Sequence, residues 1–378
     1  MIDFDARLKS LKNRRQGTRE MALAKSLSFN ESQRASFLAL GMDLRDTEDF
    51  ETITESAGVK YAIGGMAPVS AGYTRLSIAE GKRVADSLTQ SLLSQGEPTT
   101  SALQGSVALD IHIKGHSDVD MLILCRDTVR IEVPRVNPSQ YGPSQDSRDT
   151  VDIVKDIRSK SEKILPVNFW AADVDCNGSK SITISGGSLQ RKVDIVPAIW
   201  YYSRAYQSSL NDYERGVSVY DKNMHQLIVN YPFRHIKLIN DKNALYGGNL
   251  KSAVRLMKNM IADMSDDKKK VAKNLSSFDL AAIAYHIDKD LSTPPYLKLG
   301  LVEKIRGYLS ILIILNDYRN SLFVPDGTRK IFDNVNKFDA LKILSDDFED
   351  LANSIFKELR PYGSNYEASA LLDRKVMI

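Results

Sequence analysis

Two aspartates separated by one residue, Asp118 and Asp120, are the side chains of this chain best suited to chemistry. They open a near-continuous apolar run, Asp120–Cys125, which is typical of a strand covered on both faces. Side chains alternate along a strand, so both carboxylates project from the same side. Carboxylates held that closely repel each other unless a cation lies between them. Mg²⁺ suits such a pair, because it takes oxygen ligands and completes its shell with water and substrate phosphates.

A third carboxylate is expected at Asp194, on a short strand within Arg191–Pro197. Three carboxylates can hold two ions, Mg²⁺ or Mn²⁺ in its place, and two ions clamp the attacking and leaving oxygens of an in-line displacement at phosphorus. Gly105 and Ser106 supply the remaining requirement. A glycine lets the backbone approach a phosphate closely, and the neighbouring N–H and hydroxyl donate hydrogen bonds. The sequence therefore predicts metal-dependent phosphoryl chemistry at Asp118, Asp120 and Asp194.

The elements that must position these residues belong to a mixed α/β region. Apolar residues four apart predict a helix over 76–93, and residues 146–163 have the same period. Two strands, 181–185 and 191–197, are joined by Gly186-Gly187-Ser188, which is a tight hairpin signature.

After Pro232 the pattern is almost wholly helical, as in the row Leu250, Val254, Met257 and Ile261. The fold class is therefore α+β, a mixed sheet core followed by a helical C-terminal lobe. We place a helical N-terminal extension at 1–72, the core at 73–235 and the lobe at 236–378, with a loop near Gly64–Pro68 before the core.

Composition and charge narrow the class of protein. With 43% hydrophobic and 26% charged residues the chain is an ordinary globular protein, and no apolar run is long enough for a membrane span. A formal charge of +3 neither demands nor excludes nucleic acid. The short basic clusters Arg14-Arg15 and Lys268–Lys270 are interpreted as solvated helix ends or turns. Cys125 and Cys176 indicate free thiols in a reducing compartment, so we expect a cytoplasmic protein.

Other acidic and histidine pairs are interpreted as structural. Asp173 and Asp175 form another Asp-x-Asp, but they run into a turn and have no Gly-Ser upstream, so we expect a solvated strand end. Asp152 lies in a Val-Asp-Ile-Val tetrapeptide identical to that of Asp194, yet its surroundings have helical period. His112 and His116 have a zinc-like i, i+4 spacing on a helix, but Gly115 between them predicts a loop.

The order of these motifs resembles the polymerase-beta-like nucleotidyltransferases. Within them the sequence is most similar to the bacterial cGAS/DncV-like enzymes (CD-NTases), and among those to the E clade. The resemblance covers roughly residues 74–290 and is carried by the segments Gln104-Gly105-Ser106, Gly115-His116-Ser117-Asp118-Val119-Asp120, Val229-Asn230-Tyr231-Pro232, Arg255–Asn259 and Ser276-Ser277-Phe278.

The resemblance implies roles for three residues of the helical lobe. Lys258 takes the place of a helix lysine that holds the triphosphate, with a solvated helix lysine as the alternative. Ser277 matches a serine that meets the phosphates, and it is also a candidate N-cap for the helix that it starts. Phe278 stands where the family often has a tyrosine that stacks on a base. Ala281 departs from a common glutamate, which we interpret as a packing detail.

Asn230 is implied to lie at the rim of a base pocket. An asparagine amide offers a fixed donor beside a fixed acceptor, which matches the edge of uracil. We therefore expect a pyrimidine triphosphate, UTP first, together with ATP. The alternative is that Asn230 only caps the turn at Pro232.

The function that the resemblance implies is synthesis of a cyclic di- or oligonucleotide signal from nucleoside triphosphates. Such a product would act through a separate effector protein in anti-phage signalling, with no nucleic acid required and no membrane involved. Nothing in the sequence specifies an oligomeric state. The alternatives are an RNA- or protein-directed nucleotidyltransferase, or a non-catalytic binding protein, against which the intact triad argues.

Overall fold

A computed structural model describes residues 2–16, 48–363 and 365–377, and it divides the chain into two compact units. The first, here called the sheet unit, comprises Ser70–Asp110 and Ser117–Asn240. The second, the helical unit, comprises residues 1–69, 111–116 and 241–378.

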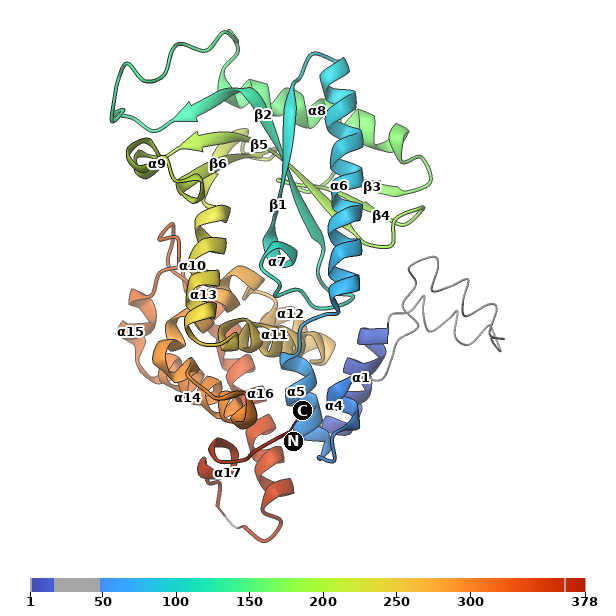
Figure 1. Cartoon of the computed structure of the whole chain (residues 1–378), viewed down its shortest axis with the longest axis vertical. Helices are drawn as coiled ribbons and strands as arrows, with labels where there is room; N and C mark the ends of the chain where they lie inside the picture. The colour runs from blue at the N-terminus through green and yellow to red at the C-terminus, as the bar shows by residue number, and fades with distance from the viewer. Residues whose placement is uncertain (1, 17–47, 364, 378) are drawn as a thin grey trace. The chain divides into compact units, whose positions relative to one another are not determined.

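The sheet unit contains all seven strands of the described chain (Figure 1). The strands are β1 (Thr99–Gln104), β2 (Val119–Ile131), β3 (Asp173–Asp175), β4 (Ile182–Ser185), β5 (Val193–Tyr202), β6 (Arg215–Asp221) and β7 (Gln226–Asn230). Its helices are α6 (Ala71–Ser94), α7 (Gly105–Ala108), α8 (Thr150–Asn168), α9 (Arg204–Ser209) and the first part of α10 (Pro232–Leu245), with a 3₁₀ turn at Asp212–Glu214.

The sheet is mixed, as predicted, with β5 at its centre. β2 and β5 run parallel, and every other pairing is antiparallel. The strand order is β1-β2-β5-β4-β3, and the far half of β5 pairs with β6, which in turn pairs with β7. The segment 186–192, which begins with Gly186-Gly187-Ser188, joins β4 to β5 as a hairpin, as predicted, but this connection is longer than the tight turn expected.

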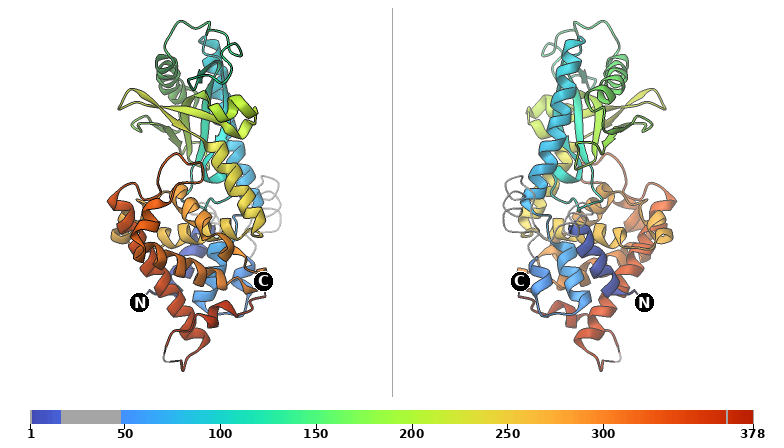
Figure 2. Two further views of the ribbon diagram at one scale, coloured as in Figure 1. Left: turned by 90° about the vertical axis from the view of Figure 1, so that its left-hand side faces the viewer. Right: turned by 90° about the vertical axis from the view of Figure 1, so that its right-hand side faces the viewer.

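The two faces of the sheet differ. One face packs against α6 and α8 through a large apolar cluster that includes Val84, Leu88, Ile157 and Ile195 (Figure 2). The opposite face carries a smaller cluster formed by alternate residues of β2, β5 and β6, among them Leu122, Leu124 and Val196. Strand alternation therefore separates a core face from a second face, and the predicted carboxylates belong to the second.

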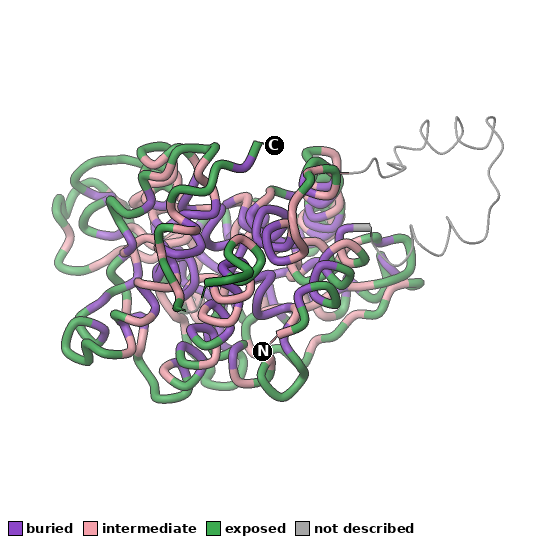
Figure 3. Tube along the Cα trace, turned by 90° about the horizontal axis from the view of Figure 1, so that it is seen from below, coloured by how far each residue is buried: buried purple, intermediate pink, exposed green. Residues whose placement is uncertain are grey.

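The helical unit surrounds one buried helix, α11 (Asn249–Ala262), in which every residue except Lys251 is buried. Its other helices are α1 (Phe4–Gln16), α4 (Asp49–Thr52), α5 (Ala57–Met66), α12 (Asp266–Ala272), α13 (Ser277–Ile287), α14 (Gly300–Ile314), α15 (Asn316–Ser321), α16 (Val335–Leu359) and α17 (Ser369–Leu372), with 3₁₀ turns at Asp288–Leu291 and Pro295–Leu297. Helices α5, α13, α14 and α16 contact α11 on different sides, so the apolar row predicted there is part of a helix buried all round. Buried stretches along the helices alternate with exposed connecting segments (Figure 3).

Gly64 and Gly65 correct one sequence prediction, because they lie inside the buried helix α5 and not in a loop. A side chain at Gly64 would meet the ring of Phe50 at 2.6 Å, and one at Gly65 would meet Leu256 at 2.9 Å. The two glycines are there because neighbouring side chains pack against the helix backbone. The turn before α6 follows at residues 67–70.

The Arg14-Arg15 cluster corrects a second prediction, because these side chains are buried in ion pairs and not solvated. Arg14 pairs with Asp263 at 2.5 Å, and Arg15 pairs with Glu48 at 2.6 Å. Arg15 also donates to the carbonyl of Pro68 at 2.7 Å. Residues 17–47, which follow this cluster, lie outside the described residues.

The boundary predictions, 1–72, 73–235 and 236–378, divide the chain into three segments, whereas the structure groups it into two units. The described helices of the first segment, α1, α4 and α5, form one unit with α11–α17 because they share its buried core and ion pairs. Cys125 and Cys176 are free thiols, as predicted. Among the described residues, no helix is both long and apolar enough to cross a membrane.

Candidate active site

Four strands place four polar residues in one row across the second face of the sheet. Gln104 on β1 lies opposite Asp120 on β2, Asp120 is in register with Asp194 on β5, and Asp194 lies opposite Thr183 on β4. Residues paired directly across a ladder share a face, at roughly 5 Å between neighbouring strands. Asp118, two residues before Asp120, belongs to the same face. The structure therefore brings all three predicted carboxylates to one place.

Asp194 is held by a cross-strand hydrogen bond. The hydroxyl of Thr183 donates to Asp194 Oδ1 at 2.6 Å. Burial raises the pKa of the Asp194 carboxyl, the Thr183 hydrogen bond acts in the opposite direction, and the nearby charge of Asp118 raises it further. Asp194 thus has a fixed orientation and an increased affinity for a proton.

Asp120 lies against the backbone of Gly105. Gly105 has a φ of +75°, which favours glycine, and a side chain there would overlap the Asp120 carboxylate. Gly105 and Ser106 open the short helix α7 directly after β1. The glycine therefore serves two needs at once, a left-handed backbone turn and room for a carboxylate.

Asp118 has a cationic partner. The Lys192 ammonium lies 2.9 Å from Asp118 Oδ2. This hydrogen bond is the largest cause of the raised pKa of Lys192, and the charges of Asp194 and Asp120 raise it further. Lys192 is fixed by the backbone, since its carbonyl accepts from Val119 N–H at 3.0 Å. Both side chains of the pair are substantially exposed, at 45% for Lys192 and 36% for Asp118.

Helix α6 supports these strand ends from the other face. The Glu80 carboxylate accepts the backbone N–H groups of Gln190 and Arg191 at 2.7–3.0 Å. The Arg191 guanidinium stacks over the Tyr73 ring at 3.8 Å, so it points away from the carboxylates. At Gly81 a side chain would meet Val119, the residue between Asp118 and Asp120, at 2.6 Å. The helix backbone therefore lies directly behind the carboxylate-bearing strand.

The three carboxylates have the right chemistry for Mg²⁺, since they are oxygen donors on one face of a sheet. Asp118 is turned to Lys192 and Asp194 to Thr183, while the Asp120 carboxylate lies close to Gly105. Within the described part of the chain, no three acidic, histidine or cysteine side chains converge closely enough to ligate one ion as they stand.

Asn230 lies on the same face, further along the sheet. It ends β7 opposite Val217, which pairs with Trp200, six residues beyond Asp194 on β5. At about 3.3 Å per residue this places the Asn230 row roughly 20 Å along the strand from Asp194. The side chain is exposed and makes no hydrogen bond to any described residue, so it does not cap the turn at Pro232.

Lys258, Ser277 and Phe278 belong to the helical unit, whereas the three carboxylates belong to the sheet unit. Lys258 is only 7% exposed, which excludes the solvated-lysine alternative. Ser277 is the first residue of α13 but not its N-cap. That role falls to Ser276, whose hydroxyl accepts from Asp279 N–H at 3.2 Å in a capping box.

Phe278 is half-buried and has a cation on its ring. The Arg329 guanidinium lies 5.4 Å from the ring centroid and pairs with Asp279 at 2.7 Å. Ala281, the departure from the family's glutamate, is fully buried, in agreement with a packing role.

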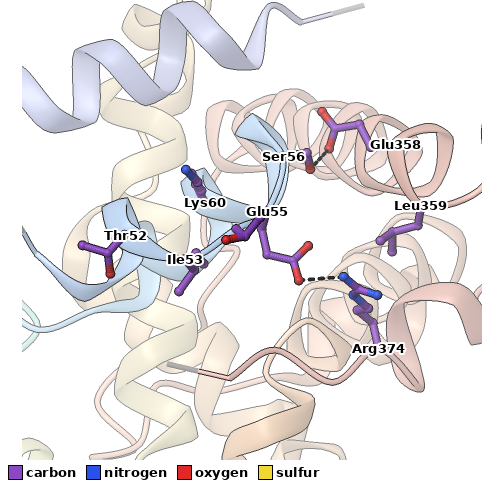
Figure 4. A pocket seen from close by; sticks show the side chains of 9 residues that line it. Thr52, Ile53, Glu55, Ser56, Lys60, Glu358, Leu359 and Arg374 are labelled. Atoms are coloured by element: carbon purple, nitrogen blue, oxygen red, sulfur yellow. Dashed lines mark hydrogen bonds and ion pairs between the residues drawn. The ribbon is translucent and has the colours of Figure 1, made fainter.

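A separate pocket of about 600 Å³ lies in the helical unit and contains none of the predicted site residues (Figure 4). Of its charged side chains, Arg374 pairs with Glu55 at 2.7 Å, Glu358 accepts from the Ser56 hydroxyl, and the Lys60 ammonium donates to the Glu51 carbonyl at 3.3 Å. Its lining residues are Thr52, Ile53, Thr54, Glu55, Ser56, Lys60, Glu358, Leu359 and Arg374. The pocket lies between the N-terminal and C-terminal segments of the helical unit.

The residues interpreted as structural lie as predicted. Asp152 is exposed on α8, Asp173 and Asp175 are exposed on β3, and His112 and His116 lie outside helices. Sequence reasoning missed Thr183 and Lys192. The sequence spacing does indicate Lys192, because this residue is two positions before Asp194 and therefore on the same face of the chain there. Thr183 is found only once the hairpin register is known.

Comparisons with known proteins agree on one family. The model of the cGAS/DncV-like nucleotidyltransferase C-terminal helical domain matches residues 237–357. The cyclic dinucleotide synthase CdnE of Yersinia aleksiciae is 34% identical over 383 residues, which cover 99% of this chain and 98% of that protein. A c-di-GMP synthase of a Lachnospiraceae bacterium is 28% identical over 344 residues, 85% of this chain and 94% of the relative. The structure of the STING-associated CdnE c-di-GMP synthase from Capnocytophaga granulosa superposes with a TM-score of 0.68 and 26% identity, over 94% of this chain and 99% of that one.

Proposed function

This chain belongs to the cGAS/DncV-like nucleotidyltransferases, and we propose that it joins nucleoside triphosphates into a cyclic dinucleotide at Asp118, Asp120 and Asp194. The observation that carries the assignment of the site is the row in which Asp120 and Asp194 are in register, with Asp118 on the same face. The full-length similarity to a cyclic dinucleotide synthase favours this reaction over RNA- or protein-directed nucleotide transfer.

The reaction forms one bond and breaks one bond at phosphorus. A ribose hydroxyl of one nucleotide attacks the α-phosphorus of the other, pyrophosphate leaves, and the hydroxyl proton must be accepted. Asp194 is suited to receive it, because burial raises the pKa of its carboxyl while Thr183 fixes its orientation. A second round within the linear intermediate closes the ring.

Asp118, Asp120 and Asp194 would hold Mg²⁺, or Mn²⁺ in its place. When bound, such ions neutralise phosphate charge and stabilise the attacking and leaving oxygens. Gly105 keeps the backbone beside Asp120 open, and the Ser106 hydroxyl adds a donor for phosphate oxygens. Lys258, Ser277 and Phe278 would contribute from the helical unit, two to the phosphates and one to a base.

Two base choices are open to test. The amide of Asn230, exposed on the carboxylate face, supports a uridine-containing product made with ATP. The relatives named c-di-GMP synthases support a product made from GTP alone. We further propose that the product acts through a separate effector in anti-phage defence in the cytoplasm, on the strength of the family resemblance.

The test uses purified protein with Mg²⁺ and all four ribonucleoside triphosphates, followed by phosphatase treatment and mass spectrometry. Wild type is expected to leave a phosphatase-resistant cyclic product, and the Asp118→Asn/Asp120→Asn double variant none. Asp194→Asn is expected to be inactive as well. Asp152→Asn, in the same Val-Asp-Ile-Val tetrapeptide but exposed on α8, should match wild type. Near-normal turnover by the double variant would overturn the assignment of the site.

A further inference from the structure

Lys192 and Asp118 are held together by the ladder between β2 and β5. Val119 is in register with Val193, so Asp118 and Lys192, one residue earlier on each strand, are neighbours across the parallel pair. The Val119 N–H to Lys192 carbonyl bond fixes the backbone at this point. The 2.9 Å contact between the two side chains is therefore a consequence of strand register.

The ammonium of Lys192 faces carboxylates and no other partner among the described residues. Its one side-chain contact is Asp118, with Asp120 and Asp194 on the same face of the sheet. The neighbouring cation, Arg191, stacks on Tyr73 and does not compete for them. An Asp118 oxygen that accepts from Lys192 is not free to ligate a divalent ion with the same lone pair, and a +1 charge beside the site opposes a +2 ion.

We propose that Lys192 is a built-in competitor for the divalent cation at Asp118. The ammonium neutralises Asp118 until a divalent ion takes its place, so Lys192 sets the metal concentration at which the site fills. This inference rests on the proposed function, because it assigns Asp118 to the metal. It adds that filling the site requires breaking an ion pair within the chain, and that Lys192 is a positioning residue for Asp118.

The experiment measures binding of Mn²⁺ without nucleotide by isothermal titration calorimetry at low ionic strength. Lys192→Met and Lys192→Gln remove the charge, and both are expected to tighten Mn²⁺ binding by about two- to fivefold, the range of a half-exposed ion pair. The half-maximal Mn²⁺ concentration for nucleotide joining should fall by the same factor. Lys222→Met is the matched control, since Lys222 is 43% exposed and pairs with Glu162 at 2.9 Å away from the row. It should bind Mn²⁺ as wild type does.

Two results would overturn the inference about Lys192 alone. One is Mn²⁺ affinity in both variants equal to or weaker than that of wild type. The other is a raised KM for nucleotide at unchanged Mn²⁺ affinity, which would make Lys192 a phosphate contact. Failure of the proposed function has a different signature, because the Asp118→Asn/Asp120→Asn variant would then bind Mn²⁺ as tightly as wild type.

Discussion

Asp194 is subject to two opposing requirements. Burial disfavours its charged form and raises the pKa of its carboxyl, whereas binding a cation or accepting a proton needs that form. The folded protein therefore holds the Asp194 proton more tightly than the unfolded chain does. As the pH rises above the ordinary aspartate value of 3.8 and through the raised pKa, ionisation of Asp194 lowers the free energy of unfolding.

Replacing Asp194 by Asn is therefore expected to remove the decrease in the free energy of unfolding that ionisation of Asp194 causes. In EDTA, the free energy of unfolding of Asp194→Asn minus that of wild type should increase as the pH rises through this window and stay constant above it. Urea unfolding at a series of pH values measures the difference. Adding Mg²⁺ at neutral pH should stabilise wild type more than the variant, because only wild type keeps all three carboxylates. A difference that does not change with pH would contradict the raised pKa.

Lys258 offers a second test at this scale. Because its side chain is buried, Lys258→Met keeps the apolar stem and removes only the charge. The KM for nucleoside triphosphate is expected to rise roughly tenfold or more, with a smaller change in kcat. The reason is that a charged contact from Lys258 to the triphosphate would be made in the ground state and the transition state alike. Lys270→Met, on an exposed position of α12, is the control. An unchanged KM would leave Lys258 with a packing role.

The three carboxylates could be predicted from the sequence because local spacing defines their positions. Asp118 and Asp120 sit two apart on one strand, and Asp194 follows a recognisable hairpin. The partners of these carboxylates are set by register between strands, which a single sequence specifies less directly. Thr183 and Lys192 therefore emerged only from the structure.

At the scale of elements, α6 and β2 meet at a glycine behind the carboxylates. Gly81→Ala would place a methyl 2.6 Å from a Val119 methyl, so helix and strand must separate. We expect a loss of about 1–3 kcal/mol in the free energy of unfolding, typical of overpacking, together with a lower joining rate as Asp118 and Asp120 shift. Gly307→Ala, in α14 with open space around the position, should instead gain about 0.5–1 kcal/mol. Urea unfolding compares the two, and equal effects would refute the packing argument.

Glycine pairs show where the prediction of elements fails. Gly186-Gly187 and Gly64-Gly65 have the same letters, and both pairs suggested turns. The first pair has positive φ and does form the hairpin, whereas the second is helical because Phe50 and Leu256 pack against its backbone. Local preference cannot distinguish these cases, since the deciding neighbours of Gly65 are far away in the sequence.

At the scale of the whole molecule, the N-terminal helix α1 is fastened to the helical unit by buried ion pairs. Arg14 pairs with Asp263, whose side chain is fully buried, and Arg7 pairs with Asp347 at 2.5 Å. These partners lie some 250 and 340 residues apart in the sequence, so no local pattern reveals them. That separation explains why Arg14 was predicted to be solvated.

Arg14→Met is expected to lower the free energy of unfolding by about 3–5 kcal/mol, because it leaves the Asp263 carboxylate buried without its cation. Lys9→Met, on an exposed position of the same helix, should stay within about 0.5 kcal/mol of wild type. Thermal and urea unfolding measure both. A small loss for Arg14→Met would mean that the hydroxyls of Tyr61 and Ser10, 2.9 and 2.8 Å from the Asp263 oxygens, are enough to satisfy the carboxylate.

The split of the helical unit between both ends of the chain also sets an order of events at the ribosome. Helix α5, with Tyr61, Ile63 and Met66 buried in the finished protein, emerges about 190 residues before Leu256 of α11, which it packs against. At about 5–20 residues per second, the interval is roughly 10–40 s. The whole sheet unit is made in that time, so it can fold while α5 still presents an uncovered apolar surface. A nascent chain arrested after β7 would therefore carry a folded sheet unit together with a helix whose apolar surface can bind other chains. Timely synthesis of α11 is then a condition for avoiding aggregation.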